Sequence, residues 1–195
     1  MKNTIFTILL LLFCVTSITT NGQVRVGVSG GIIQSTIYDK YLTKENMLWR
    51  TGFKFGIGLE IGLPKNWALN IDVFNYSLRG FKIDEYQNYN VHVIMNIPLT
   101  TSYKFSIVKN KLAILPFVGI GTGINVNGAN NPYYYEPENL RLFGFNLVGG
   151  IAAELFKNIH IGVQYEHGLV AIFKEQPYLP AWYNRGLEYY IKFFF

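Results

Sequence analysis

The stretch Phe53-Lys-Phe-Gly-Ile-Gly-Leu-Glu-Ile-Gly62 decides the fold, because apolar residues occupy every odd position and no even one. The even positions hold glycines and the charged residues Lys54 and Glu60. A hydrophobic period of two is typical of a β-strand with one apolar face, since successive side chains point to opposite sides. The sequence therefore predicts a strand over 53–62 with one side in an apolar medium.

Seven further segments show the same alternation. They cover 24–29, 69–73, 90–99, 118–126, 143–155, 159–166 and 187–195. From residue 23 onward the chain shows no helical periodicity and no run of 18 apolar residues, which excludes a helical membrane protein. We therefore predict an all-β protein with eight strands.

The connections between these strands alternate in length. Short turns are predicted at Pro64–Asn66, Val108–Lys111 and Lys157–Asn158, and long loops near 35–49, 80–88, 127–140 and 172–184. In an outer-membrane barrel the periplasmic turns are short, the external loops are long, and the strand number is even. The pattern therefore favours an eight-stranded antiparallel up-and-down transmembrane β-barrel.

The composition supports a membrane environment for this barrel. Of 195 residues, 50% are hydrophobic, 16% aromatic and 15% charged, whereas soluble domains carry about 25% charged residues. A disordered chain is excluded. A soluble sandwich or lipocalin-like barrel is the main alternative, but it would place the aromatic-rich face in the lumen and the charged face outside. The net charge of +5 is spread along the chain, which gives little support to nucleic-acid binding.

In one strand the alternation changes phase. After Val73 the apolar residues, from Phe74 to Leu78, stand at even positions. A β-bulge near the outer rim would re-phase the strand in this way. The alternative is that the strand has left the membrane at this point.

The first 22 residues have the order of a secretory signal peptide. Lys2 precedes the apolar run 5–15, and a polar stretch leads to Gly22, where cleavage would follow the small-residue rule. The run is too short for a permanent anchor. Cys14, the single cysteine, would leave with the signal, and a lipidated Cys14 is the alternative. We expect a signal peptide over 1–22 and a barrel domain over 23–195 without thiol chemistry.

Three segments, Asn96-Ile-Pro-Leu99, Tyr103-Lys-Phe105 and Pro116-Phe-Val-Gly-Ile-Gly121, resemble strands of the small outer-membrane β-barrel proteins common in Bacteroidetes. These proteins are described as porin-family or PorT-like, and are related in architecture to the OmpA transmembrane domain. The ending is similar to their terminal strand, where an assembly signal for the barrel-assembly machinery would comprise Tyr189, Ile191, Phe193 and Phe195. The resemblance implies the outer membrane of a diderm bacterium and this fold, and it implies no activity. PorT itself takes part in secretion and gliding.

The same parity predicts nine charged side chains in the barrel interior. They are Arg25, Lys54, Glu60, Asp72, Lys104, Glu154, Glu166, Glu188 and Lys192. An eight-stranded barrel is only wide enough for its interior to be filled by side chains, and unpaired buried charges are costly. We therefore expect acids and bases to pair as a structural plug. A narrow pore with an ion path is the alternative.

The histidines raise an enzymatic alternative, because some eight-stranded barrels modify lipid A. Such chemistry needs a nucleophile, a base and an acid together at the outer leaflet. His92 and His160 would face inward, and His167 has no serine near it in its strand. Ser35 and Ser77 are remote in sequence but would be able to approach in space. The favoured hypothesis is a non-enzymatic protein with no cofactor and, from residue spacing, no metal site.

Four of the five arginines, Arg50, Arg79, Arg141 and Arg185, stand where a long loop meets a strand. They would lie at the outer rim, level with lipid phosphates. A planar guanidinium binds phosphate bidentately, so lipopolysaccharide contact is our hypothesis. Ordinary snorkelling at the interface is the alternative.

Aromatic residues would form girdles at both membrane interfaces. Trp67, Phe156, Phe193 and Phe195 would belong to the inner girdle, and the aromatic-rich loop segments 130–135 and 176–182 would be able to bind a protein or glycan. We expect a monomer with a structural or surface-interaction role through four external loops. The first alternative is a PorT-like accessory of a secretion or envelope-assembly machine.

Overall fold

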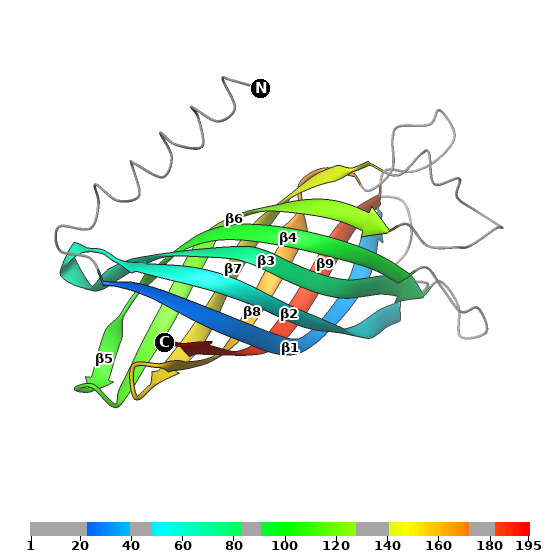
Figure 1. The fold of residues 1–195 in the computed structure, drawn as a ribbon. Coiled ribbons are helices and arrows are strands. Elements are labelled where there is room, and N and C mark those ends of the chain that lie inside the picture. Colours follow the sequence, from blue (N-terminus) through cyan, green and yellow to red (C-terminus); the bar gives the residue numbers. More distant parts are fainter. Residues whose placement is uncertain (1–22, 40–47, 83–90, 128–140, 172–181) are drawn as a thin grey trace, which may run out of the picture.

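The computed structural model describes residues 23–39, 48–82, 91–127, 141–171 and 182–195. These residues form a closed antiparallel barrel (Figure 1). Its strands are β1 (Val24–Asp39), β2 (Leu48–Gly62), β3 (Trp67–Lys82), β4 (Val91–Tyr103), β5 (Phe105–Val108), β6 (Leu112–Asn127), β7 (Phe143–Leu155), β8 (Ile159–Gly168) and β9 (Trp182–Phe194). A single 3-10 turn, η3 (Pro64–Asn66), joins β2 to β3. None of the described residues forms a helix long and apolar enough to cross a membrane.

Two pairings, β1–β9 and β4–β6, complete the ring of strands. The strand order is β4-β3-β2-β1-β9-β8-β7-β6-β5, and β4 also pairs with β6. β1 pairs with β9 from Gly27↔Phe194 to Asp39↔Trp182. At the β4–β6 seam a Cβ atom on Gly119 would lie 2.0 Å from the carbonyl oxygen of Leu99, so only glycine fits there. The predicted eight-stranded barrel is confirmed, with β5 as a short extra strand beyond the ring.

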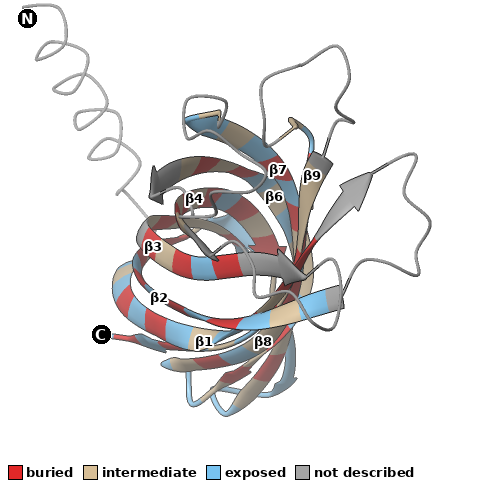
Figure 2. Ribbon diagram, turned by 90° about the vertical axis from the view of Figure 1, so that its right-hand side faces the viewer, coloured by how far each residue is buried: buried red, intermediate tan, exposed pale blue. Residues whose placement is uncertain are grey.

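The two faces of the wall have the predicted polarity. On β2, Phe53 is 68% and Phe55 63% exposed, whereas Lys54 between them is 5% exposed. Figure 2 shows buried and exposed residues alternating along the strands in the same way. Because the apolar side chains lie outside and the charged ones inside, the polarity is opposite to that of a soluble barrel.

The phase change in β3 is a β-bulge. Gly58 of β2 pairs with Asp72 and the adjacent Ile57 pairs with Phe74, so Val73 is the extra residue. The bulge lies in the middle of β3 and not near its outer end. Beyond the bulge β3 pairs with β2 again as far as Lys82, so the strand is re-phased within the barrel wall.

The short turns, the start of β1 and the C-terminus lie at one end of the barrel (Figure 1). Lys65, Asn110 and Lys157 in these turns have φ values of 59°, 61° and 68°, as expected for tight turns between antiparallel strands. The predicted 1–22 signal peptide lies outside the described residues.

At the opposite end the strands run further than the sequence predicts. β1 continues to Asp39 and β9 begins at Trp182, and the two remain paired to the end. The predicted loop limits of 35–49 and 172–184 are wrong there, because the alternation fades while backbone pairing continues. The remaining segments at this end, 40–47, 83–90, 128–140 and 172–181, lie outside the described residues.

Candidate functional site

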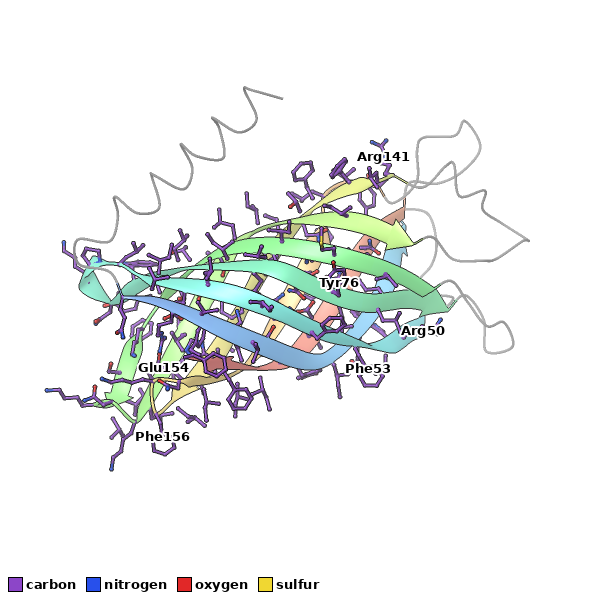
Figure 3. The ribbon with its side chains drawn as sticks, in the orientation of Figure 1. Arg50, Phe53, Tyr76, Arg141, Glu154 and Phe156 are labelled. Atoms are coloured by element: carbon purple, nitrogen blue, oxygen red, sulfur yellow. The ribbon has the colours of Figure 1, made fainter. Side chains whose placement is uncertain are left out.

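The barrel interior contains the charged side chains that the sequence predicts there. The structure buries Lys54, Glu60, Asp72, Glu154, Glu166, Glu188 and Lys192. The side chains of Arg25 and Lys104 are 14% and 31% exposed. In Figure 3 the labelled Glu154 lies within the barrel, whereas Phe53 and Phe156 project from its outer surface. The interior is therefore the charged region of the molecule.

The loop-side cluster lies in the half of the barrel nearer the long connections. It consists of Lys54, Ser77, Arg79, Asn96, Gln164, Glu166 and Glu188. Arg79 forms ion pairs with Glu166 and, at 3.3 Å, with Glu188, and Lys54 also pairs with Glu188. These four ionic side chains are at most 3% exposed, and the pairs join strands β2, β3, β8 and β9 across the lumen.

Neutral side chains add hydrogen bonds to the carboxylates of this cluster. Asn96 donates to Glu166 at 2.8 Å. Gln164 donates to Glu166 at 3.0 Å and to Glu188 at 2.9 Å. Multiple donors are what a buried carboxylate needs once water is excluded. The sequence reasoning did not assign these two amides to the site.

The turn-side cluster lies near the short turns and consists of Arg25, Glu60, Lys104, Glu154 and His160. Arg25 pairs with Glu60 and, at 3.3 Å, with Glu154, and Lys104 also pairs with Glu154. His160 Nε2 lies 3.3 Å from a Glu154 carboxylate oxygen. This cluster joins β1, β2 and β7 to the β4–β5 junction.

A polar cavity of about 30 Å³ lies between the two clusters. Asp72 and Lys192 form an ion pair at 2.6 Å, and both line the cavity. The Ser29 hydroxyl also lines it, and has no hydrogen-bond partner among the described residues. Because a water molecule needs about 10–15 Å³ of such space, the cavity suits one or two waters.

Each of the nine predicted interior charges has an oppositely charged partner within 4 Å. Such an arrangement fills the lumen and ties the strands to one another. Among the described residues, no group of three or more His, Cys, Asp or Glu side chains is arranged to hold a metal ion. The geometry is that of paired charges which link the strands across the interior.

Arg79 is the exception among the predicted rim arginines. It is 3% exposed and its guanidinium lies in the loop-side cluster, so the prediction that it contacts lipid phosphates is wrong. The cause is the bulge at Val73, which turns Asn75, Ser77 and Arg79 toward the interior. The phase change after Val73 was visible in the sequence and would have located Arg79 correctly.

The structure places Ser35 and Ser77 on one face of the wall and His167 on the other. Ser35 and Ser77 are 2% and 1% exposed and face the interior. His167 adjoins the buried Glu166 in β8, so strand alternation puts its side chain on the outer face of the wall. The His92 side chain lies outside the described residues.

Residues 17–174 match the family model described as the outer membrane protein β-barrel domain. This chain belongs to that family. It is an outer-membrane β-barrel protein. No curated protein matches the chain in sequence.

Solved structures of other outer-membrane barrels are similar to it. Neisserial surface protein A has 11% identity and a TM-score of 0.52, covering 87% of this chain and 97% of its own. Ail of Yersinia pestis, in complex with the heparin analogue sucrose octasulfate, has 14% identity and a TM-score of 0.45, covering 89% of this chain and 99% of its own. OprG of Pseudomonas aeruginosa has 10% identity and a TM-score of 0.44, covering 88% of this chain and 95% of its own. At this identity the similarity to the neisserial protein supports the fold alone.

The outer-membrane barrel carries its other three rim arginines at the loop end. Arg50 and Arg141 are labelled there in Figure 3, and Arg185 is in β9 opposite His167 of β8. All three are half-buried. They are therefore at the level where the external connections begin.

The aromatic residues of the barrel lie mostly on its outer face. Phe195 is 81%, Phe156 67% and Trp67 45% exposed at the end with the short turns. Tyr189, Ile191, Phe193 and Phe195, the residues of the predicted assembly signal, are all exposed in one outward-facing row. The loop segments 130–135 and 176–181 lie outside the described residues.

Proposed function

We propose that this outer-membrane barrel is non-enzymatic and closed inside, and that it has a structural or surface-interaction role through its four external loops. The observation that carries the proposal is the pairing of all nine predicted interior charges, with Arg79 as a tenth. Side chains from β2, β3, β8 and β9 meet across the lumen in the loop-side cluster. A continuous water-filled path would require these pairs to separate, and a buried charge without its partner is costly.

Electrical recording tests the closed interior. The purified protein, inserted in a planar lipid bilayer, is expected to show no stable large conductance. A sixteen-stranded porin, which has a wide aqueous channel, serves as the positive control under the same salt and voltage. Reproducible open-channel steps well above the protein-free background would contradict the closed barrel and favour the narrow pore.

The rim arginines support lipopolysaccharide as a partner of this barrel. Arg50, Arg141 and Arg185 stand at the loop ends of β2, β7 and β9, where a guanidinium would meet the phosphates of the outer leaflet. Replacing all three with Gln is expected to reduce the lipopolysaccharide that co-purifies with the protein. The matched control replaces Lys65, Lys109 and Lys157 at the opposite end. Equal loss in both variants, or no loss in either, would leave simple snorkelling as the explanation.

A place in a secretion or envelope-assembly machine is the second candidate. It is supported by the resemblance of Asn96–Leu99 and Pro116–Gly121 to PorT-like barrels. In-cell crosslinking through the external loops would recover a defined partner complex if this candidate holds. Recovery of the barrel alone would favour the simpler structural role.

A further inference from the structure

A groove of about 560 Å³ crosses the outer wall of the barrel where β4 gives way to β5. It is lined by Trp67, Thr101, Tyr103, Phe105, Pro116, Phe117 and Val118. Trp67 packs edge-on against Tyr103 with ring centroids 5.0 Å apart, and Tyr103 packs in the same way against Phe105 at 4.7 Å. This aromatic ladder forms one wall, and the smaller Thr101 and Pro116 leave the space beside it.

The groove coincides with an interruption in strand pairing. The β4–β6 ladder ends at Ser102↔Phe117, and the β5–β6 ladder begins at Phe105↔Ile114. Pro116 lies in the interval and has no backbone N–H to donate. The N–H of Lys104 donates instead to the carbonyl of Asn66 in the neighbouring turn, at 2.9 Å. The groove is therefore built by the backbone of the seam and not only by side-chain choice.

β5 fixes the depth of the groove in the membrane. In the described part of the chain β5 pairs with β6 alone, and all four of its residues are exposed. Its other edge carries unpaired backbone groups, which hydrocarbon cannot solvate. β5 must therefore lie at the level of the head groups or beyond, and the groove beside it lies where acyl chains meet head groups.

The exposed side-chain charges of the described residues at this end are positive. Lys65, Lys109, Lys111 and Lys157 of the short turns are exposed. The acidic side chains there, Glu60 and Glu154, are 6% and 3% exposed and lie inside the barrel. Lys65 stands two residues before Trp67 in the chain, so a cation adjoins the aromatic wall of the groove.

We propose that the groove binds an acyl chain of an anionic glycerophospholipid from the periplasmic leaflet, whose head-group phosphate contacts Lys65, Lys109 and Lys111. The apolar lining receives the chain, the aromatic ladder suits the interfacial depth, and the lysines select negative charge. The site is at the opposite end of the barrel from the rim arginines. It rests on the membrane placement of the barrel and not on the proposed lipopolysaccharide contact.

Lipid retention measures this site directly. The protein is exchanged from mild detergent into vesicles of phosphatidylethanolamine and phosphatidylglycerol, re-extracted, and examined by native mass spectrometry. We expect one retained phospholipid per chain, enriched in phosphatidylglycerol. Replacing Lys65, Lys109 and Lys111 with Gln is expected to lower the ratio of retained phosphatidylglycerol to phosphatidylethanolamine about five-fold or more. The variant R50Q/R141Q/R185Q, which removes the same charge at the opposite end of the barrel, should keep it.

A second pair of variants tests the groove itself. Thr101→Trp fills the groove and is expected to remove the retained lipid, whereas Val28→Trp, on an equally lipid-facing part of β1, should not. The control is a heat-dependent gel shift, which is expected for both variants if they fold. Equal retention of both phospholipids by the unaltered protein, or retention unchanged by Thr101→Trp, would overturn the proposal. A dimer that Thr101→Trp dissociates would also overturn it, and would make a second copy the occupant.

Discussion

Among the individual residues, Arg79 is the cation that pairs with both carboxylates of the loop-side cluster. Its guanidinium contacts Glu166 and Glu188, and its Nε donates to the Ser77 hydroxyl at 2.8 Å. Lys54 is the other cation of this cluster. The two buried carboxylates therefore depend on Arg79, together with Lys54, to balance their charge.

Replacing Arg79 with Ala is expected to destabilise the folded barrel by about 3–5 kcal/mol, because it leaves a buried carboxylate without its cation. Arg141→Ala, at the half-buried rim, should cost at most about 1 kcal/mol. Urea unfolding in lipid vesicles, followed by tryptophan fluorescence, measures both. Adding Glu166→Gln to Arg79→Ala should restore part of the loss. If Arg79→Ala were as stable as Arg141→Ala, the pairing would not hold the interior together.

At the scale of the element, the bulge in β3 allows a sharp test. Val73 is the extra residue opposite β2, and the β3–β4 register shifts in the same region. Deleting it leaves Asp72 and Asn75 facing inward and removes the register shift at this point of both ladders. Deleting Tyr76 instead reverses every later residue of β3, which turns Arg79 toward lipid.

The deletion of Val73 should therefore yield a barrel that still shows heat-dependent gel mobility, and the deletion of Tyr76 should not. The two variants remove one residue each from the same strand, so chain length is matched. Loss of the gel shift in the Val73 deletion would mean that the local twist of the bulge is itself required for closure. Retention in both would contradict the assigned faces of β3.

Strand faces and short turns could be predicted from the sequence because each depends on local chemistry. The alternation in 53–62 comes from the two media on either side of the wall, and the short turns contain Lys-Asn pairs. The partner of each interior charge could not be predicted, because it depends on strand order and stagger around the barrel. Lys54 of β2 meets Glu188 of β9 only because β1 alone separates those strands.

Over the whole molecule, the acidic side chains and the exposed lysines of the described residues lie in different places. The five acidic side chains whose burial is described, Glu60, Asp72, Glu154, Glu166 and Glu188, all lie in the interior. The exposed lysines on the short turns lie at the end that carries the start of β1 and the C-terminus. Interior pairing and surface cations are thus separate features, since the first closes the lumen and the second faces one membrane interface.

The orientation of the barrel can be tested with single cysteines. The sequence has one cysteine, Cys14, inside the expected signal peptide, so the background should be free of thiols. We expect Lys109→Cys, in the turn between β5 and β6, to react with a membrane-impermeant maleimide only after the outer membrane is permeabilised. Glu136→Cys, in the long connection after β6, should react on intact cells. Labelling of Lys109→Cys on intact cells would mean that the barrel has the opposite orientation. The groove and its lysines would then face lipopolysaccharide rather than phospholipid.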